Sequence, residues 1–169
     1  MRLFFSKLKT KLGRLLYNHI LSNFGFGNRI SRIIWEKQFD EGFWDYLYDK
    51  QEQEHYRYIS SRSINGEKRI LDVGCGQGVL YYYLTKEIAS PDYLGIDISR
   101  KAIQLAESRF PQGSFRQLDF QHRNLNTKFD LIIFNETLYY FNQPLKTVEK
   151  CDKQNLNPDG VLIISMCDF

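Results

Sequence analysis

Residues 70–80 have the sequence Ile-Leu-Asp-Val-Gly-Cys-Gly-Gln-Gly-Val-Leu, a short apolar run that leads into three glycines at alternate positions. The run is typical of a buried β-strand, and the residues after the glycines are helical in pattern. Gly74, Gly76 and Gly78 permit backbone conformations closed to other residues and leave room for a ligand against the main chain. The first turn of the following helix offers free N–H groups. This strand–turn–helix unit predicts a site for a nucleotide-like cofactor.

Downstream of residue 68, short apolar runs alternate with helical or loop segments. They predict five strands, at residues 70–73, 93–97, 114–118, 130–134 and 161–166. Their interiors are almost wholly apolar, which is typical of parallel strands covered by helices on both faces. Helices are expected at 79–88 and 99–110, the second capped by Ser99, whereas 121–128 is too short and polar for a long helix. The predicted fold class is α/β, with a doubly wound, mostly parallel, Rossmann-like sheet.

The segment from Trp35 to Ser63 predicts two helices, because Phe39, Phe43 and Leu47 recur every fourth residue. Gly42 weakens the first helix by roughly 1 kcal/mol relative to alanine and favours a break there. The aromatic side chains of this segment are expected mainly to cover one face of the core. The alternative is that part of the cluster forms a lid over a ligand pocket.

Length and composition limit the class of protein. A chain of 169 residues with 43% apolar and 15% aromatic residues has room for one domain and is too apolar to be disordered. The longest apolar runs fall well short of the ~20 residues of a membrane-spanning helix. Three cysteines without CxxC spacing and three scattered histidines favour a reducing, cytoplasmic location and predict no metal site.

Charge is unevenly distributed along the chain. Residues 1–37 hold eight Lys or Arg and one acid, which leaves 15 basic and 19 acidic residues elsewhere. We therefore divide the chain into a basic N-terminal extension, 1–34, and a cofactor-binding domain, 35–169, with a helical cap at 35–66 and an α/β core at 67–169. Four leucines at helical spacing predict a basic amphipathic helix in the extension: Leu8, Leu12, Leu15 and Leu16. It could pack on the domain, contact a membrane surface peripherally through residues 1–21, or help to grip nucleic acid.

Three acidic residues stand at predicted strand ends. Asp72 precedes the first glycine by two residues, where an anion would repel a pyrophosphate and suit a cationic ligand; the third glycine also comes one residue too early for the GxGxxG of NAD sites. Asp97 lies at the distance expected of an acid that accepts hydrogen bonds from ribose. Asp119, followed by Phe120, could bind an adenine amino group and pack on its ring. Each acid alone could be a cap or loop residue, but the three share the carboxyl edge of one sheet.

With these residues in place, the chain resembles class I S-adenosylmethionine-dependent methyltransferases. The matching motifs are LDVGCGQG (71–78), GIDIS (95–99), RQLDF (116–120), FDLIIFNETLYYF (129–141) and LNPDGVLIISM (156–166). The resemblance implies S-adenosyl-L-methionine as cofactor. The residues that it implies around the cofactor are Asp72, Gly74, Cys75 and Gly76 at the methionine part, Asp97 and Ile98 at the ribose, Asp119 and Phe120 at the adenine, and Asn135 near the methionine amino group. Gly78 is also counted among the cofactor-binding residues.

The resemblance further implies methyl transfer to a small-molecule or glycan-like acceptor without a protein nucleophile. Glu136 and His55 are the candidate general bases, although a loop acid and a packing histidine are the ordinary roles of such residues. The alternatives are a truncated or inactive cofactor-binding protein that needs a partner, an RNA methyltransferase suggested by the basic extension, and an NAD-dependent oxidoreductase. The sequence after the fourth strand lacks Asn-Pro-Pro-Tyr, which disfavours adenine methylation in DNA, and nucleic acid is not the expected partner.

The family's sheet usually has seven strands, whereas this sequence stops at Phe169, soon after the fifth. Strand 161–166 would then be an exposed apolar edge, a template for pairing with another chain. Truncation, completion by a partner or second copy, and a compact natural variant are the three explanations. We favour truncation or self-association through residues 161–166.

Overall fold

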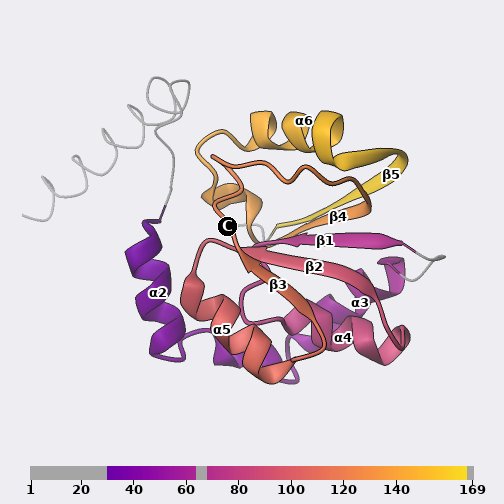
Figure 1. The fold of residues 1–169 in the computed structure, drawn as a ribbon. Coiled ribbons are helices and arrows are strands. Elements are labelled where there is room, and N and C mark those ends of the chain that lie inside the picture. Colours follow the sequence, from indigo (N-terminus) through magenta and orange to yellow (C-terminus); the bar gives the residue numbers. More distant parts are fainter. Residues whose placement is uncertain (1–29, 64–67, 167–169) are drawn as a thin grey trace, which may run out of the picture.

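The computed structural model describes residues 30–63 and 68–166. Its centre is a five-stranded sheet in the order β3-β2-β1-β4-β5, in which all neighbouring strands are parallel (Figure 1). The strands are β1 (Arg69–Val73), β2 (Asp92–Asp97), β3 (Ser114–Gln117), β4 (Phe129–Asn135) and β5 (Leu156–Ser165). The helices are α2 (Arg32–Asp40), α3 (Gln53–Ser63), α4 (Val79–Glu87), α5 (Arg100–Arg109) and α6 (Pro144–Asn155), with short 3-10 helices η3 (Asp45–Tyr48) and η4 (Leu138–Tyr140).

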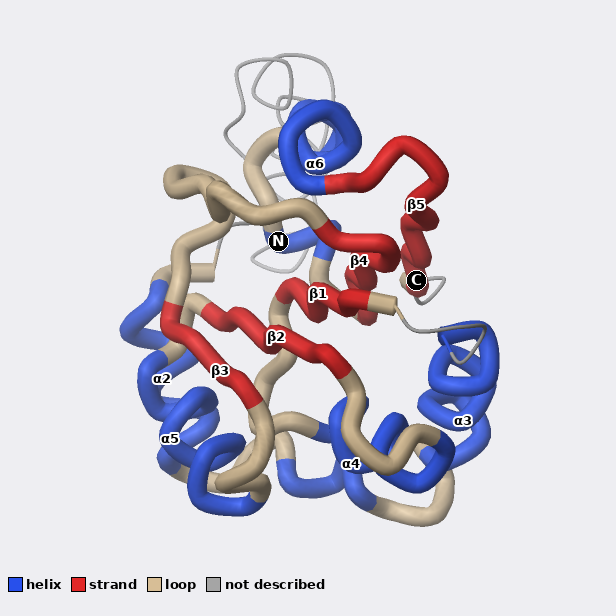
Figure 2. Tube along the Cα trace, turned by 45° about the vertical axis from the view of Figure 1, so that its right-hand side comes forward, coloured by secondary structure: helices blue, strands red, loops and turns tan. Residues whose placement is uncertain are grey.

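Helices cover both faces of the sheet. α3, α4 and α5 lie on one side and α6 on the other (Figures 1 and 2). Because neighbouring residues of a strand point to opposite faces, a strand covered twice needs apolar residues at consecutive positions. β4 meets this requirement: Ile133 packs in the cluster that includes Leu84 of α4, and Ile132 and Phe134 pack in the cluster that includes Cys151 of α6. The predicted α/β class and doubly wound sheet are confirmed.

The first four predicted strands end within one residue of the observed ones, but β5 differs. It begins at Leu156, five residues earlier than predicted, because Leu156 pairs with Phe129 ahead of a register irregularity in β4. The Asn-Pro-Asp-Gly sequence at 157–160 favours a turn, which hid this part of the strand. α6 was not anticipated either. Its buried positions are Thr147, Cys151 and Asn155, a helical stripe that is not apolar enough to show as periodicity.

Upstream of the sheet, α2 ends at Asp40, just before Gly42, whose φ is +71°. The break expected at this glycine is therefore present, and a turn and η3 separate α2 from α3. The predicted extension 1–34 lies outside the described residues except for 30–34, and α2 runs across its predicted boundary. The expected helix with the four leucines also lies outside them. In the described part of the chain, no helix combines the length and the apolar character that crossing a membrane requires.

The long β3–β4 connection is attached to α6 by a buried amide. The Asn155 side chain is fully buried, and its Nδ2 donates to the carbonyl oxygens of Leu125, at 2.6 Å, and Thr127, at 3.1 Å. These bonds hold the residues that follow Asp119 and Phe120 against the sheet. The α6 helix thereby helps to fix the rim of the sheet where the predicted adenine site lies.

We expect Asn155→Ala to destabilise the fold by about 1–3 kcal/mol, because it leaves two carbonyl groups without their donor. The measurement is the midpoint of urea unfolding, with the exposed Lys153→Ala on the same helix as control. An Asn155→Ala midpoint equal to that of the control would show that the amide does not hold this connection.

Candidate functional site

A cavity of about 570 Å³ opens at the carboxyl ends of the strands. This is within the roughly 300–1,000 Å³ usual for small-molecule sites. It is centred on β1 and β4, where the crossover connections diverge to opposite faces of the sheet, the place where open α/β sheets bind ligands. Of the residues predicted to form the site, all but one line this cavity: His55, Asp72, Gly74, Cys75, Gly76, Asp97, Ile98, Asp119, Phe120, Asn135 and Glu136.

Gly78 is the predicted site residue that the structure places elsewhere. It caps α4 with φ at +84°, and a β-carbon there would stand 3.0 Å from the ring of Phe110. Gly78 therefore serves the turn into α4 and its packing rather than the cavity wall. Gly74 has the same left-handed geometry with φ at +81°, and a β-carbon on it would stand 2.4 Å from the Thr137 side chain. Only glycine fits at these two positions.

Asp97 connects the end of β2 to the glycine turn. Its Oδ2 accepts a hydrogen bond from the Gly76 N–H at 3.0 Å, and its Oδ1 accepts one from the Ser99 N–H at 2.8 Å. Burial raises the pKa of Asp97 to about 6, although these backbone donors oppose the rise. The carboxyl group is thus held in one orientation at the wall of the cavity.

Asp72 is the more deeply buried acid, with 2% of its surface exposed. Its Oδ2 accepts a hydrogen bond from the Tyr93 hydroxyl at 2.7 Å. Burial, the main cause, raises its pKa to about 7; the Tyr93 hydrogen bond opposes this rise and the nearby Asp97 charge adds to it. A buried carboxylate lacking a cationic partner is costly, so a cation at this wall would be favourable.

The charge of the cavity wall has one sign. Five of its lining residues are carboxylic acids, and none of the described lining residues is Lys or Arg. The five acids are Glu52, Asp72, Asp97, Asp119 and Glu136. Such a wall repels phosphate and pyrophosphate groups and attracts cations, which disfavours a dinucleotide ligand. Among the described residues, no group of three or more His, Cys, Asp or Glu is arranged to hold a metal ion.

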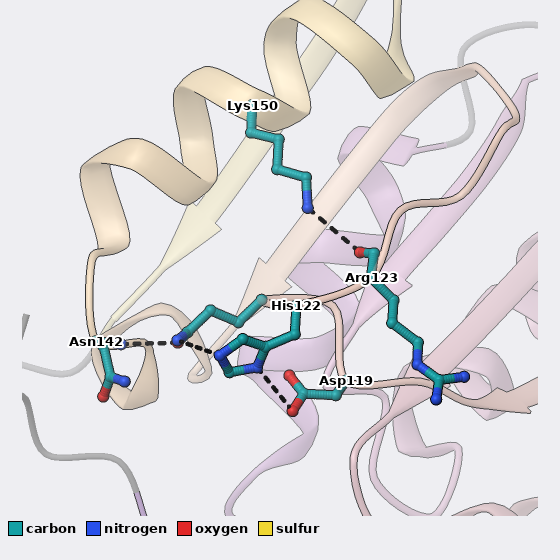
Figure 3. Close-up of polar contacts among 6 residues, drawn as sticks. Asp119, His122, Arg123, Asn142 and Lys150 are labelled. Carbon is teal, nitrogen blue, oxygen red and sulfur yellow. Dashed lines mark hydrogen bonds and ion pairs between the residues drawn. The ribbon is translucent and has the colours of Figure 1, made fainter.

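Asp119 and Phe120 lie where the chain leaves β3. Asp119 Oδ2 is 3.0 Å from Nδ1 of His122, and the other ring nitrogen of His122 is 3.5 Å from the amide nitrogen of Gln121 (Figure 3). The Asn142 N–H donates to Gln121 Oε1, and Lys150 Nζ donates to the Arg123 carbonyl (Figure 3). This loop is therefore bonded both to α6 and to the segment that precedes it. Phe120 is buried in the core beneath it.

Both candidate bases, His55 and Glu136, line the cavity. His55, from α3, has its Nε2 at 2.6 Å from Oδ1 of Asn135, at the end of β4. Glu136 follows with φ at +54°, a strained conformation for a residue other than glycine. Its carboxylate accepts hydrogen bonds from the hydroxyls of Tyr139, at 3.1 Å, and Ser165, at 3.2 Å.

Aromatic residues of α2, η3 and the turn between them complete the wall. Trp35, Phe39, Trp44 and Tyr46 line the cavity, and we refer to this part of the chain, α2 to η3, as the aromatic lid. The ring centroids of Trp35 and Tyr140 are 4.9 Å apart, which links α2 to η4. The segment also contacts the core, since Phe39 is buried and Tyr48 packs against the core cluster that includes Leu84. The expected cover over the core therefore describes only part of this segment, and a role as a lid over a bound ligand stays a prediction.

Glu36 attaches this lid to the rest of the molecule, and no sequence motif pointed to it. Its carboxylate accepts hydrogen bonds from the Ser99 hydroxyl and from the backbone N–H groups of Arg100 and Lys101, all between 2.8 and 2.9 Å. These are the free donors at the start of α5. Tyr93 and Gln77 were missed too; buried Gln77 donates to the Trp44 carbonyl at 2.8 Å and so holds the glycine turn beneath η3.

The sheet order, the glycine turn and the acids at the strand ends define a class I S-adenosylmethionine-dependent methyltransferase fold. A family model described as a methyltransferase domain matches residues 64–169, and the chain belongs to that family. This confirms the family resemblance of the sequence motifs.

Individual relatives cover parts of the chain. The chain is 41% identical over 98 residues to a malonyl-[acyl-carrier protein] O-methyltransferase of Acetivibrio thermocellus, covering 57% of this chain and 34% of that protein. It is 31% identical over 122 residues to a ubiquinone biosynthesis O-methyltransferase of Haemophilus ducreyi, covering 65% and 50%. The chain thus spans half or less of the length of these relatives. The N-methyltransferase NodS of Bradyrhizobium japonicum WM9, solved with S-adenosyl-L-homocysteine, superposes with a TM-score of 0.63 at 22% identity over 77% of this chain and 71% of NodS.

The buried acids predict an unusual dependence of stability on pH. Asp72 and Asp97 have raised pKa values, about 7 and about 6, so the ligand-free folded protein holds protons that the unfolded chain has already released. Its free energy of unfolding should therefore fall as pH rises from about 4 to about 7. Asp72→Asn should flatten this dependence and stabilise the ligand-free protein at pH 8 by on the order of 2 kcal/mol. Urea unfolding at a series of pH values measures it.

The exposed Asp152→Asn on α6 is the matched control and should reproduce the native pH dependence. Equal slopes for Asp72→Asn and the native protein between pH 4 and pH 7 would contradict the assignment of this effect to Asp72.

Proposed function

We propose that this protein binds S-adenosyl-L-methionine in the cavity and transfers its methyl group to a small-molecule acceptor. The observation that carries the proposal is the wall of five carboxylic acids without Lys or Arg among the described lining residues. The cofactor carries an ammonium and a sulfonium, which such a wall attracts. Its relatives named as O-methyltransferases and the NodS structure with S-adenosyl-L-homocysteine support the same reaction class.

The residues present fit this cofactor. Buried Asp72, with Gly74, Cys75 and Gly76, would accommodate the methionine part, and Asn135 would approach its amino group. Asp97, held in orientation by two backbone donors, would accept the ribose hydroxyls beside Ile98. Asp119 and Phe120 would bound the adenine. When bound, the cofactor supplies an electrophilic methyl group on a positively charged sulfur, so the chain's own task is to align the acceptor and exclude water.

His55 and Glu136 are the two residues placed to receive a proton from an acceptor, since both line the same part of the cavity. Methylation of RNA is the less favoured alternative. The acidic cavity wall would repel a phosphate backbone, and the basic residues 1–29 that suggested RNA lie outside the described part of the chain. Cofactor binding without transfer, in a protein that needs a partner, is the other alternative, and a transfer assay decides it.

Binding of S-adenosyl-L-homocysteine should change the intrinsic fluorescence, because both tryptophans of the chain, Trp35 and Trp44, line the cavity. Asp97→Ala should weaken binding in calorimetry roughly 10- to 100-fold, the usual loss for hydrogen bonds to a charged group. Asp97→Asn keeps the side-chain volume and guards against a folding defect. NAD serves as the negative control ligand.

An unchanged dissociation constant in both variants would show that Asp97 is not part of the binding site. Binding of NAD but not of S-adenosyl-L-homocysteine would overturn the proposal. For turnover, the protein is incubated with methyl-labelled cofactor and a cell extract, and labelled products are found by mass spectrometry. Cofactor binding without any labelled product would support the inactive alternative.

We further propose that the protein self-associates through residues 161–166 and contacts membranes peripherally through residues 1–21. β5 is an edge of the described sheet; Val161 and Ile164 on it, and Met166 just after it, are 42–55% exposed. We expect sedimentation to show dimers or larger species, and Ile164→Lys to shift them towards monomer, because a charge on an apolar edge opposes pairing. Leu145→Lys, on α6, is the control. A native protein that stays monomeric at high concentration would contradict self-association.

A further inference from the structure

The contact between His55 and Asn135 defines which nitrogen of the histidine ring carries a proton. Nε2 of His55 is 2.6 Å from Oδ1 of Asn135, a carbonyl oxygen that can only accept. Nε2 must therefore donate, and in the neutral ring the lone pair is then on Nδ1. The two residues are 80 positions apart, on α3 and β4, so the fold itself creates the pair. The Tyr56 ring packs edge-on against the imidazole with centroids 5.4 Å apart and limits its rotation.

Glu136 is arranged differently. One of its carboxylate oxygens accepts from the Tyr139 hydroxyl and the other from the Ser165 hydroxyl, and its backbone N–H donates to the Ser165 carbonyl at 2.9 Å. A proton arriving at either oxygen would compete with one of these donors. The strained residue is thus organised to hold the end of β4 against β5 and η4. His55 is the better placed proton acceptor of the two.

We propose that Asn135 holds His55 in the Nε2–H tautomer, and that Nδ1 of His55 accepts the proton of a phenolic hydroxyl acceptor. This inference rests on the proposed function, because the acceptor oxygen must meet the methyl group of a bound cofactor. Asn135 acts here as a positioning residue and His55 as a catalytic residue.

The acceptor class follows from what a neutral base can do in an acidic cavity. An anionic acceptor would be repelled by the wall and needs no base. An alkylamine is protonated at neutral pH, and the acidic wall would hold it as an ammonium ion without a nucleophilic lone pair. A hydroxyl is a weak nucleophile until its proton is removed. Phenols ionise near pH 10, which is within reach of an imidazole. The aromatic rings that line the cavity suit an aryl body.

The step balances without any further reactant. The acceptor oxygen forms a bond to the methyl carbon while the carbon–sulfur bond breaks and its electron pair stays on sulfur. The hydroxyl proton passes to Nδ1 of His55, and the imidazolium later releases it to water. The products are an aryl methyl ether and S-adenosyl-L-homocysteine.

Other titratable groups line the cavity and would also affect the pH dependence of methyl transfer. They are Glu52 before α3, Tyr56 on α3, Tyr46 on η3, Asp72 and Cys75 around the end of β1, and Glu136 and Tyr139 after β4. Replacement of the amide partner by a carboxylate, Asn135→Asp, adds a negative charge at hydrogen-bond distance from His55. It should favour the doubly protonated ring over the neutral Nε2–H tautomer, because the added charge attracts the imidazolium.

The first test needs no acceptor. The chain has three histidines, so long-range ¹H–¹⁵N spectra of labelled protein, with His55→Gln for assignment, resolve the His55 ring. We expect the Nε2–H tautomer in the native protein, its loss in Asn135→Ala, and a larger share of doubly protonated ring at the same pH in Asn135→Asp. An Nδ1–H tautomer in the native protein, or an unchanged ring in Asn135→Ala, would overturn the positioning role.

The second test measures transfer to catechol and to benzylamine as probes. His55→Gln should lower kcat for catechol about 100-fold or more and abolish the acid limb of its pH profile, while the dissociation constant of S-adenosyl-L-homocysteine stays the same. Arg57→Gln, exposed on the same helix, is the control. A His55→Gln variant with native kcat, or methylation of benzylamine and not catechol, would overturn this inference alone. Failure of the native protein to bind S-adenosyl-L-homocysteine would instead overturn the proposed function.

Discussion

The structure depends on carboxyl groups that the fold buries at the ends of its central strands. Asp72 and Asp97 stand at the carboxyl ends of β1 and β2, where the parallel sheet directs all its strand termini to one edge. Each carboxyl oxygen used within the fold accepts from a tyrosine hydroxyl or a backbone N–H, and the rise in both pKa values shows that these donors do not offset the cost of burial. Burial of these groups as anions is unfavourable for the fold, and a cation bound beside them would offset that cost.

The main chain around these acids is fixed from two directions. From below, glycines with positive φ turn the chain sharply from β1 into α4, and the Gly76 N–H is already bonded to Asp97. From above, Gln77 reaches the carbonyl of Trp44 and Tyr48 donates to the carbonyl of Gln77 at 2.8 Å. The glycine turn is therefore held by the aromatic lid as well as by the sheet. Binding in the cavity and the packing of the lid must be coupled through this one turn.

Much of this could be predicted from the sequence, because the core elements carry strong local signals. Apolar runs predicted the bounds of four strands to within one residue. The acids and most of the glycines at the strand ends lie at the cavity because the carboxyl ends of parallel strands share one edge of the sheet. Gly78 was misplaced because spacing alone cannot separate a glycine that faces a ligand from one that faces Phe110. Glu36, Gln77 and Tyr93 gave no signal, since their partners are 21 to 65 positions away and several of them are backbone atoms. His55 and Asn135 were each predicted as site residues, but not as a hydrogen-bonded pair, because they are 80 positions apart in the sequence.

The attachment of α2 shows why the lid is the adjustable part of the molecule. Only Phe39 of α2 is buried, while Ile33 and Ile34 are 77% and 48% exposed, so apolar burial contributes little to its position. The Asp40–Lys101 pair is 2.7 Å long but solvent-exposed, which leaves it screened and weak. Two specific contacts add to these: Trp35 packs against Tyr140 of η4, and the Glu36 carboxylate accepts from the N–H groups that open α5, where the helix dipole also favours a negative charge. Because Ser99 bonds both Glu36 and Asp97, the lid is anchored on the same residue that orients the acid proposed for the ribose. The contact that attaches α2 and the contact that orients the acid at the cavity wall therefore share one residue, at the start of α5.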